Sequence, residues 1–397
     1  MKKLGISLGV IVILSALIWS LIGSDWRRFL VNLPTNADVL FWSQGQRAAG
    51  FRMMDRVPML VEARKISAGD TTRAFEVSSE LSLPIDLDAY MQSQNHASLI
   101  VVQDGAIRLE RYGLGFEQDG RWTSFSVAKS LTSTLVGIAV KEGDIESLSD
   151  PVSKYIEGLK GSSYDDVTIE QLLTMSSGVA WNETYTDPNS DVARFNEHVA
   201  EDGGSNLVSY MSALPRAHPA GEVWNYSTGE TNMIGVLVME ATGKDLSDYL
   251  SEKIWAPYGM QQDASWLINE DGSEISGCCI QAATRDFARF GQFILDGGQI
   301  DGVDLLPEGW IERATTKRID FGLPGYGYGY QWWTYDSGAF AAQGIFGQGI
   351  YIDPSRNLII ASNSNWTTAL GDVGGESDRR EAFYQTVVDA IDAEAAP

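Results

Sequence analysis

A serine and a lysine three residues apart are the side chains of this sequence best placed for chemistry. Ser126 and Lys129 lie in the segment TSFSVAKS (residues 123–130), at the start of a predicted helix. Positions three apart share one face of a helix, so the Lys129 amine can reach the Ser126 hydroxyl. A serine hydroxyl needs an adjacent base to become a nucleophile, and a lysine serves when burial lowers its pKa. The spacing therefore points to acyl transfer through a covalent serine ester, with helix N-terminal N–H groups facing the oxyanion.

The same spacing has a simpler interpretation, because serine-x-x-lysine arises by chance in many chains. Ser126 would then cap the helix, and Lys129 would be a solvated helix residue. Other side chains offer little competing chemistry. The three histidines, His96, His198 and His218, are far apart and lack metal-ligand spacing, so neither a metal site nor a serine–histidine–aspartate mechanism is expected.

Composition excludes several classes of protein. The 397 residues are 44% hydrophobic and 21% charged, which is typical of a globular chain and not of a disordered one. Twenty-nine basic residues against 53 acidic ones give a net charge of −24, and phosphate backbones repel such a chain. Cys278 and Cys279 are adjacent, and neighbouring cysteines rarely satisfy disulfide geometry, so we expect small buried residues and a core held by burial alone.

The first 24 residues predict a membrane anchor or a signal segment. Lys2 and Lys3 precede an uncharged stretch, 4–22, of 19 residues. A helix of that length spans roughly 28 Å, about one hydrocarbon core. We expect an uncleaved anchor at the cell membrane with the rest of the chain exported, although Arg27 and Arg28 weaken this orientation. A cleaved signal peptide is the alternative.

The helices and strands predicted along the chain must position the serine and the lysine. Residues 25–82 show no clean period and are interpreted as an arm or linker, and residues 83–397 as one domain. Helices are expected at 126–141, 169–175, 229–241, 245–255, 284–296 and 377–393, and strands at 98–102, 107–112, 326–335, 339–345, 349–352 and 358–363. Early strands, central helices and late strands favour an α+β fold in which both ends of this domain share one antiparallel sheet.

Several ordered motifs strengthen the catalytic interpretation. The segments FSVAKSLTSTLVG (125–137), LSDPV (148–152), IEQLLTMSSG (169–178) and GEVWNYST (221–228) together resemble the serine β-lactamase-like hydrolases. That family includes class C β-lactamases, D-alanyl-D-alanine carboxypeptidases, esterases and 6-aminohexanoate-dimer hydrolases. The resemblance implies an antiparallel sheet flanked by helices, an all-helical insert, and an active site between them.

The resemblance also implies roles for individual residues. Ser126 corresponds to the acylated nucleophile, Lys129 to the general base, and Tyr226 to the phenol that carries a proton to the leaving group. A phenol beside an ammonium could ionise more easily or relay a proton, whereas the alternative is a core tyrosine. The backbone N–H groups of Ser126 and Ile345 would form the oxyanion hole. Tyr185 would contact substrate over the cleft, or be a surface-loop tyrosine. No metal or organic cofactor is implied.

Two positions depart from the penicillin-recognising members. Ala342, in AQGI (342–345), stands where those enzymes carry lysine or histidine, and Thr228 replaces a frequent asparagine. The segments FGQG (346–349) and YTDP (185–188) look more like the 6-aminohexanoate-dimer hydrolase and carboxylesterase branch. We therefore expect a hydrolase of a small ester or amide. The alternatives are a D-alanyl-D-alanine carboxypeptidase or weak β-lactamase, and a silent anchored binding protein. The acyl group and the oligomeric state stay open.

Overall fold

An eight-stranded sheet forms the central layer of the computed structural model, which describes residues 19–34, 36, 38–57, 61–201 and 203–395. Its strands run in the order β10-β11-β12-β13-β14-β3-β4-β2, antiparallel except for the β2–β4 pair. The bounds are β2 Glu76–Val77, β3 His96–Gln103, β4 Ala106–Tyr112, β10 Tyr326–Tyr328, β11 Trp333–Tyr335, β12 Phe340–Gly344, β13 Gln348–Asp353 and β14 Leu358–Ser364. Because β3 pairs with β14, both ends of the predicted domain share one sheet, as expected.

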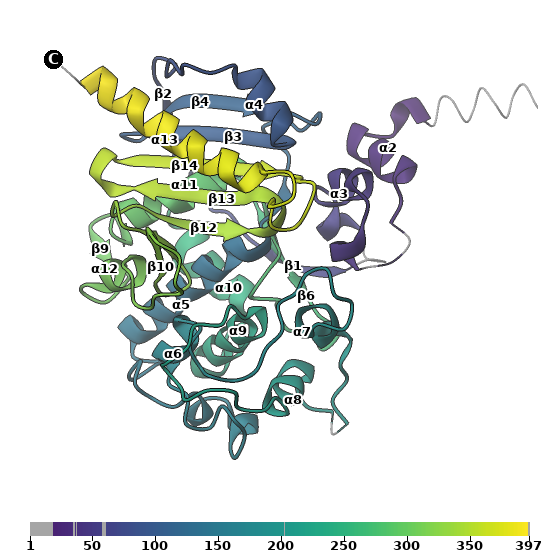
Figure 1. Cartoon of the computed structure of the whole chain (residues 1–397), viewed down its shortest axis with the longest axis vertical. Coiled ribbons are helices and arrows are strands. Elements are labelled where there is room, and N and C mark those ends of the chain that lie inside the picture. Colours follow the sequence, from purple (N-terminus) through teal and green to yellow (C-terminus); the bar gives the residue numbers. More distant parts are fainter. Residues whose placement is uncertain (1–18, 35, 37, 58–60, 202, 396–397) are drawn as a thin grey trace, which may run out of the picture.

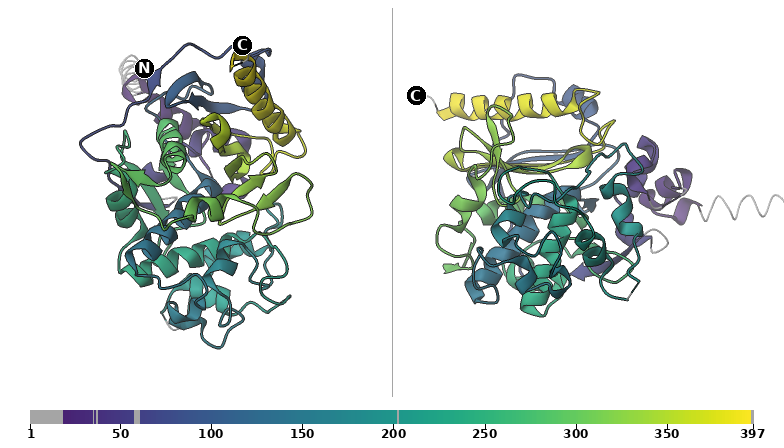
Figure 2. Two further views of the ribbon diagram at one scale, coloured as in Figure 1. Left: turned by 90° about the vertical axis from the view of Figure 1, so that its left-hand side faces the viewer. Right: turned by 60° about the horizontal axis from the view of Figure 1, so that its bottom comes forward.

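Helices cover both faces of this sheet. The C-terminal helix α13 (Glu376–Ala395) lies across one face, seen at the top of the right-hand view in Figure 2. Its apolar residues Phe383 and Val387 pack against Val101 and Ile360 of the sheet. Helices α5 (Ala128–Glu142) and α11 (Thr284–Leu295) pack against the other face. Since alternate residues of a strand point to opposite faces, two-sided burial explains the continuous apolar run in β3.

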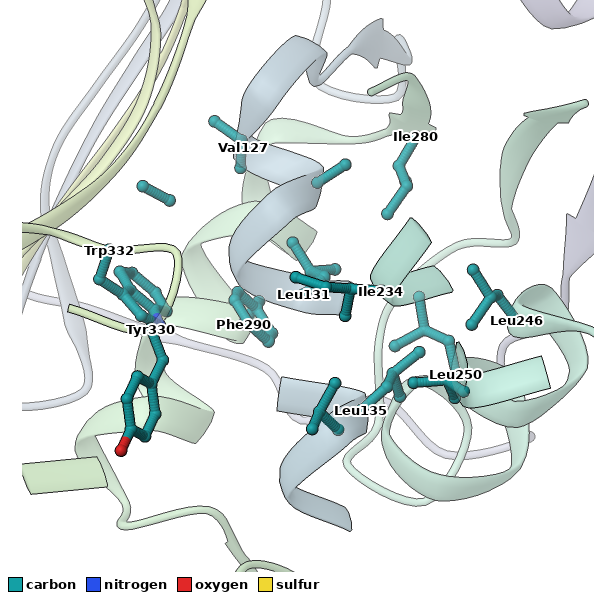
Figure 3. Packing of buried hydrophobic residues seen from close by; sticks show 14 of the residues in the cluster. Val127, Leu131, Leu135, Ile234, Leu246, Leu250, Ile280, Phe290, Tyr330 and Trp332 are labelled. Atoms are coloured by element: carbon teal, nitrogen blue, oxygen red, sulfur yellow. The ribbon is translucent and has the colours of Figure 1, made fainter. Parts of the chain in front are cut away.

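A helical part lies beyond α5, at the bottom of Figure 1. Its elements are α6 Ile169–Leu173, α7 Asp191–Arg194, α8 Asn206–Ser212, α9 Thr228–Thr242 and α10 Leu246–Leu250, which a π turn extends over Ser251–Trp255. Thr168 begins α6 with a capping box that also uses Gln171. Helix α5 is buried from Ala128 to Ala139. Figure 3 shows its residues Leu131 and Leu135 among side chains of α9, α10 and α11.

A second sheet was not anticipated from the sequence. Its order is β1-β6-β7-β5, with bounds β1 Glu62–Ile66, β5 Trp122–Thr123, β6 Ala264–Ile268 and β7 Ile280–Ala282. The sequence predicted strands of the large sheet only, because the short strands of the second sheet carry almost no periodic signal of their own. Likewise the predicted strand 326–335 is two strands, β10 and β11, joined by a turn at Gly329–Trp332.

The cysteine prediction also needs correction. Cys278 and Cys279 are joined to each other by a disulfide bond, although neighbouring residues rarely form one. The bond closes a ring between neighbours and cross-links no distant part of the chain, so the core is still held by burial.

The remaining elements belong to the N-terminal part and to the loops between the sheets. They are the helices α2 Ser24–Val31, α3 Gln44–Gly50, α4 Leu87–Ser93 and α12 Trp310–Thr315, and the hairpin β8 Gln299–Ile300 with β9 Val303–Asp304. The predicted membrane span lies mostly in residues 1–18, outside the described residues. Within the described part of the chain, no helix is long and apolar enough to cross a bilayer.

One buried carboxyl in the helical part makes stability depend on pH. Glu230, in the first turn of α9, is 2% exposed, and its Oε1 accepts hydrogen bonds from the Ser177 hydroxyl and, at 3.4 Å, from Tyr164. Burial raises the pKa of Glu230 from 4.5 to about 8. The folded protein therefore holds this proton across a range in which the unfolded chain loses it.

We expect Glu230→Gln to flatten the decline in stability between pH 4.5 and 8. Stability linked to Glu230 is fully present below its unfolded pKa and is lost as pH rises through the folded pKa of about 8. Melting temperatures of both proteins across this pH range test the prediction. The slope of melting temperature against pH is the quantity compared, because burying the glutamine amide adds the same cost at every pH. Parallel curves for the two proteins would contradict the assignment.

Candidate active site

Ser126 sits on a sharp turn between the second sheet and α5. Strand β5 leads into the 3-10 turn η3 (Phe125–Val127), and α5 follows directly. Phe125 has a left-handed backbone, with φ of 42°. A non-glycine residue in this region costs about 1–3 kcal/mol, so the surrounding structure must hold it. Ser126 is 8% exposed. The turn thus leaves Ser126 slightly exposed, while its neighbours Phe125 and Val127 are buried.

The Lys129 side chain is enclosed in the protein, 1% exposed. Its Nζ donates hydrogen bonds to Thr228 Oγ1 at 3.0 Å and to the Gly277 carbonyl at 2.7 Å. Desolvation lowers the pKa of Lys129 from 10.5 to about 7, and the charge of Glu183 opposes part of this shift. A substantial fraction of this amine is therefore neutral at neutral pH, which is the form that can accept a proton. The interpretation of Lys129 as a solvated helix residue is wrong.

Tyr226 lies beside both residues. Lys129 Nζ lies 5.3 Å from the centre of its ring, and the Ser126 side chain is close enough to lower the pKa of Tyr226 in part. Burial, followed by the charge of Glu183, raises the pKa of Tyr226 above its ordinary 10. Both effects favour the neutral phenol, so Tyr226 keeps its proton at neutral pH. Of the two possibilities considered from the sequence, the environment favours a proton relay over an ionised phenol.

Glu183 is a member of this cluster that the sequence analysis did not identify. Its carboxylate accepts hydrogen bonds from the Thr228 backbone N–H at 3.0 Å, from the Thr228 hydroxyl, from Trp181 Nε1 and from the Tyr185 hydroxyl at 2.9 Å. Thr228 therefore links the Lys129 amine to a carboxylate, since its hydroxyl accepts from one and donates to the other. The replacement of asparagine by Thr228 was the only sequence signal for this chain of hydrogen bonds.

The end of β12 lies directly against the serine turn. A Cβ on Gly344 would lie 2.6 Å from the Ser124 carbonyl oxygen and 3.1 Å from the Ser126 nitrogen, so only glycine allows this approach. Ile345 follows in the 3-10 turn η8 (Ile345–Gly347), whose Phe346 is also left-handed, with φ of 61°. The structure therefore brings Ile345 beside the backbone of Ser126.

Tyr185 and Ala342 frame the cluster. Tyr185 is half-buried and is held over it by its hydrogen bond to Glu183. Ala342 is buried on the face of β12 that packs toward α5 and so brings no cation there. Gln343 points to the opposite face, where its Oε1 accepts from Arg380 at 2.7 Å. Trp333 stacks on Tyr226 with ring centres 5.7 Å apart.

In the described part of the chain, no group of three or more His, Cys, Asp or Glu side chains is arranged to hold a metal ion.

Sequence comparison identifies the family to which this arrangement belongs. The beta-lactamase family model matches residues 87–384, so the chain belongs to the family of serine β-lactamase-like and penicillin-binding-protein-like hydrolases. A 6-aminohexanoate-dimer hydrolase from Paenarthrobacter ureafaciens is 27% identical over 336 residues, covering 81% of this chain and 85% of the relative. A beta-lactamase from Pseudomonas fluorescens is 24% identical over 184 residues, covering 44% of this chain and 48% of the relative.

Solved structures agree on the fold. A putative 6-aminohexanoate-dimer hydrolase from Bacillus anthracis superposes with a TM-score of 0.77 at 23% identity, covering 89% of this chain and 95% of that one. A penicillin-binding protein from Bacillus halodurans gives a TM-score of 0.59 at 16% identity, covering 76% and 99%. The expected β-lactamase/transpeptidase-like fold, with antiparallel sheets flanked by helices, is confirmed.

The electrostatic link between Glu183 and Lys129 predicts a shift in the pH dependence of hydrolysis. Glu183→Gln removes the charge that raises the pKa of Lys129, so that pKa should fall below its value of about 7. The acidic limb of a kcat/KM profile should then move to lower pH, because the neutral amine persists there. Asp187→Asn, the same charge change in the same loop, serves as the control and should leave the limb in place. An unmoved limb in Glu183→Gln, or one moved to higher pH, would contradict this coupling.

Proposed function

We propose that this protein is a serine hydrolase that cleaves an ester or amide bond through an acyl-enzyme on Ser126. The observation that carries the proposal is the buried Lys129 amine, held by Thr228 and Gly277 and lying 5.3 Å from the centre of the Tyr226 ring. A neutral amine has two N–H groups for those two acceptors, which leaves its lone pair for the Ser126 proton. A lysine general base requires such a lone pair within reach of the serine, and the spacing of three residues supports that reach.

Acylation follows from these positions. As Ser126 Oγ attacks the substrate carbonyl, Lys129 takes the hydroxyl proton, and the oxyanion is bound by the N–H groups of Ser126 and Ile345. The bond to the leaving group breaks as Tyr226 gives it the phenolic proton, and the Lys129 ammonium returns a proton to Tyr226. Water then attacks the acyl-enzyme, gives its proton to Lys129 and releases the acid, and Ser126 recovers its proton.

Thr228 and Glu183 support the charged intermediate of this cycle. When Lys129 becomes an ammonium it must stay buried, where an uncompensated charge is costly. The Glu183 carboxylate, one hydroxyl away, offsets that cost without contacting the amine, so Lys129 is not held permanently as an ammonium ion.

The substrate class follows from what lies beside the serine. Ala342 offers no cation to a penicillin carboxylate, and Glu183 adds a negative charge, so β-lactams should react slowly. The likeness to a 6-aminohexanoate-dimer hydrolase over 81% of the chain supports small amides or esters instead. A D-alanyl-D-alanine carboxypeptidase, a weak β-lactamase and a silent anchored binding protein are the competing functions.

The proposal predicts that Ser126→Ala abolishes both hydrolysis and labelling by a fluorophosphonate while leaving the melting temperature unchanged. The substrates are p-nitrophenyl esters of varied chain length, 6-aminohexanoate dimer, D-Ala-D-Ala peptides and nitrocefin. We expect turnover of esters or the amide dimer and little turnover of nitrocefin. Preferred turnover of nitrocefin or D-Ala-D-Ala peptides supports the first two alternatives. Failure of every acylating probe to label the natural chain supports the binding protein.

We also propose that the N-terminal part attaches the enzyme to a membrane. The apolar stretch 4–22 is followed by α2, whose Trp26, Leu30 and Val31 are exposed, as is Leu21 before it. Aromatic and aliphatic side chains exposed next to such a stretch suit the interface between lipid tails and water. Export of the catalytic domain is part of the same proposal.

Fractionation of expressing cells tests this attachment. The full chain should stay with membranes after a carbonate wash, whereas a chain without residues 1–22 should be released and keep its hydrolytic activity. Recovery of the full chain in the supernatant would contradict the proposal. N-terminal sequencing separates the alternative, because a mature protein that starts near residue 24 was cleaved as a secreted precursor.

A further inference from the structure

Three phenylalanine rings join the N-terminal part of the chain to the backbone of the active site. Phe51 follows α3, Phe125 precedes the nucleophile, and Phe346 follows Ile345. The ring centres of Phe51 lie 4.9 Å from Phe125 and 5.5 Å from Phe346, and the latter two lie 5.6 Å apart. All three belong to one buried cluster. Phe51 therefore contacts both turns that supply the oxyanion-hole N–H groups of the proposed mechanism.

Both of these turns need external support. Phe125 and Phe346 have left-handed backbones, which side chains larger than glycine rarely adopt and which persist only when neighbours hold them. The Phe51 carbonyl also accepts a hydrogen bond from the Thr123 N–H at 3.0 Å, so it holds the strand that leads to Ser126. Phe51 thus contacts the serine turn through both its ring and its backbone.

Arg47, one helical turn before Phe51, secures the Phe346 side. Its guanidinium donates to the Asn365 side chain at 3.1 Å, to the Trp366 carbonyl at 2.9 Å and to the Thr367 carbonyl at 3.1 Å. It also lies 4.4 Å from the centre of the Phe346 ring. Trp366 in turn donates its backbone N–H to the Phe346 carbonyl at 3.1 Å. These contacts enclose the Phe346 turn from both sides.

The partners of Arg47 are unusual for a buried cation. The side chain is 6% exposed, and the four hydrogen-bond acceptors found for it are neutral: three are already named, and the fourth is the Trp42 carbonyl at 2.7 Å. Burial lowers the pKa of Arg47 to about 10, so it keeps its charge at neutral pH. Burying a charge without a carboxylate is costly, and three of the four hydrogen bonds of Arg47 join the segment 365–367 to the arm.

We propose that Phe51 and Arg47 are positioning residues of the active site, which hold the Phe125 and Phe346 turns so that the N–H groups of Ser126 and Ile345 converge on the oxyanion. This inference rests on the proposed acyl-enzyme function. Neither residue touches substrate, so both act through the backbone of the two turns. Loss of either should weaken binding of the tetrahedral state and leave binding of the planar substrate unchanged.

Two variants, Phe51→Leu and Arg47→Met, test the proposal. Single-turnover acylation of a p-nitrophenyl ester separates the substrate dissociation constant from the acylation rate constant. Because misplacement of an oxyanion donor by about 1 Å costs on the order of 10²-fold, we expect the rate constant to fall ~10- to 100-fold. The dissociation constant of the substrate should stay within about twofold. The inhibition constant of phenylboronic acid, which becomes tetrahedral on the serine, should rise by the same factor as the rate falls.

Matched controls come from the same cluster. Phe116→Leu removes a ring that packs on Trp122 with centres 5.3 Å apart, and Arg52→Met removes the other buried arginine of the arm. The hydrogen bonds of Arg52 go to the Leu114 and Gly115 carbonyls, to the Ala48 carbonyl and to Asp25, and none of these partners belongs to either turn. Both controls should lower the melting temperature as much as the test variants do, while leaving the acylation rate and boronate inhibition near those of the natural chain.

The outcomes separate positioning from general stability and from the function itself. Rates are compared at temperatures well below the melting temperature of each protein. Each rate is expressed per active site, and the active sites are counted by titration with a fluorophosphonate. Unchanged boronate inhibition in Phe51→Leu and Arg47→Met overturns the inference, as does an equal loss in the controls. If the natural chain is not labelled at Ser126 at all, the proposed function has failed. If it is labelled and the variants behave like the natural chain, only the positioning role has failed.

Discussion

The burial of the Lys129 amine is the constraint on which the rest of the site depends. An ammonium removed from water is costly, so the enclosed amine must be neutral for part of the time and must have acceptors in either form. Thr228, at the start of α9, and the Gly277 carbonyl, just before β7, provide them. The helical part and the second sheet must therefore meet α5 within hydrogen-bonding distance of one nitrogen atom.

The same convergence accounts for three backbone positions at the site, Gly344, Phe125 and Phe346. Gly344 lets β12 approach the Ser126 backbone more closely than any side chain would permit. The turns at Phe125 and Phe346 bring two backbone segments together. Both phenylalanines adopt left-handed backbone conformations, which are unfavourable without support from neighbouring residues. Packing around Phe51 offsets that cost. Segments that are far apart in the chain thus build a single site together.

Local patterns predicted much of the fold. The hairpin β3–β4, the capping box of α6 and the long helices follow from apolar spacing and turn residues within a few positions of one another. Strands β1 and β5 could not be predicted, because each is short and is stabilised by partners more than a hundred residues away in sequence. The place of Glu183 in the site could not be predicted for the same reason, because its neighbours in the chain do not indicate that Thr228 lies beside it.

The sequence by itself determined that Ser126 and Lys129 share one face, since three residues of helix set that relation locally. It also determined the family, because the motifs and their order along the chain can be recognised without knowing which residues they contact. Only the tertiary structure decided what surrounds this pair. The pKa of Lys129, the proton retained by Tyr226 and the packing of Phe51 against Phe125 and Phe346 all arise from desolvation and from long-range packing. Those energies depend on what encloses a group, and no local pattern of residues encodes that enclosure.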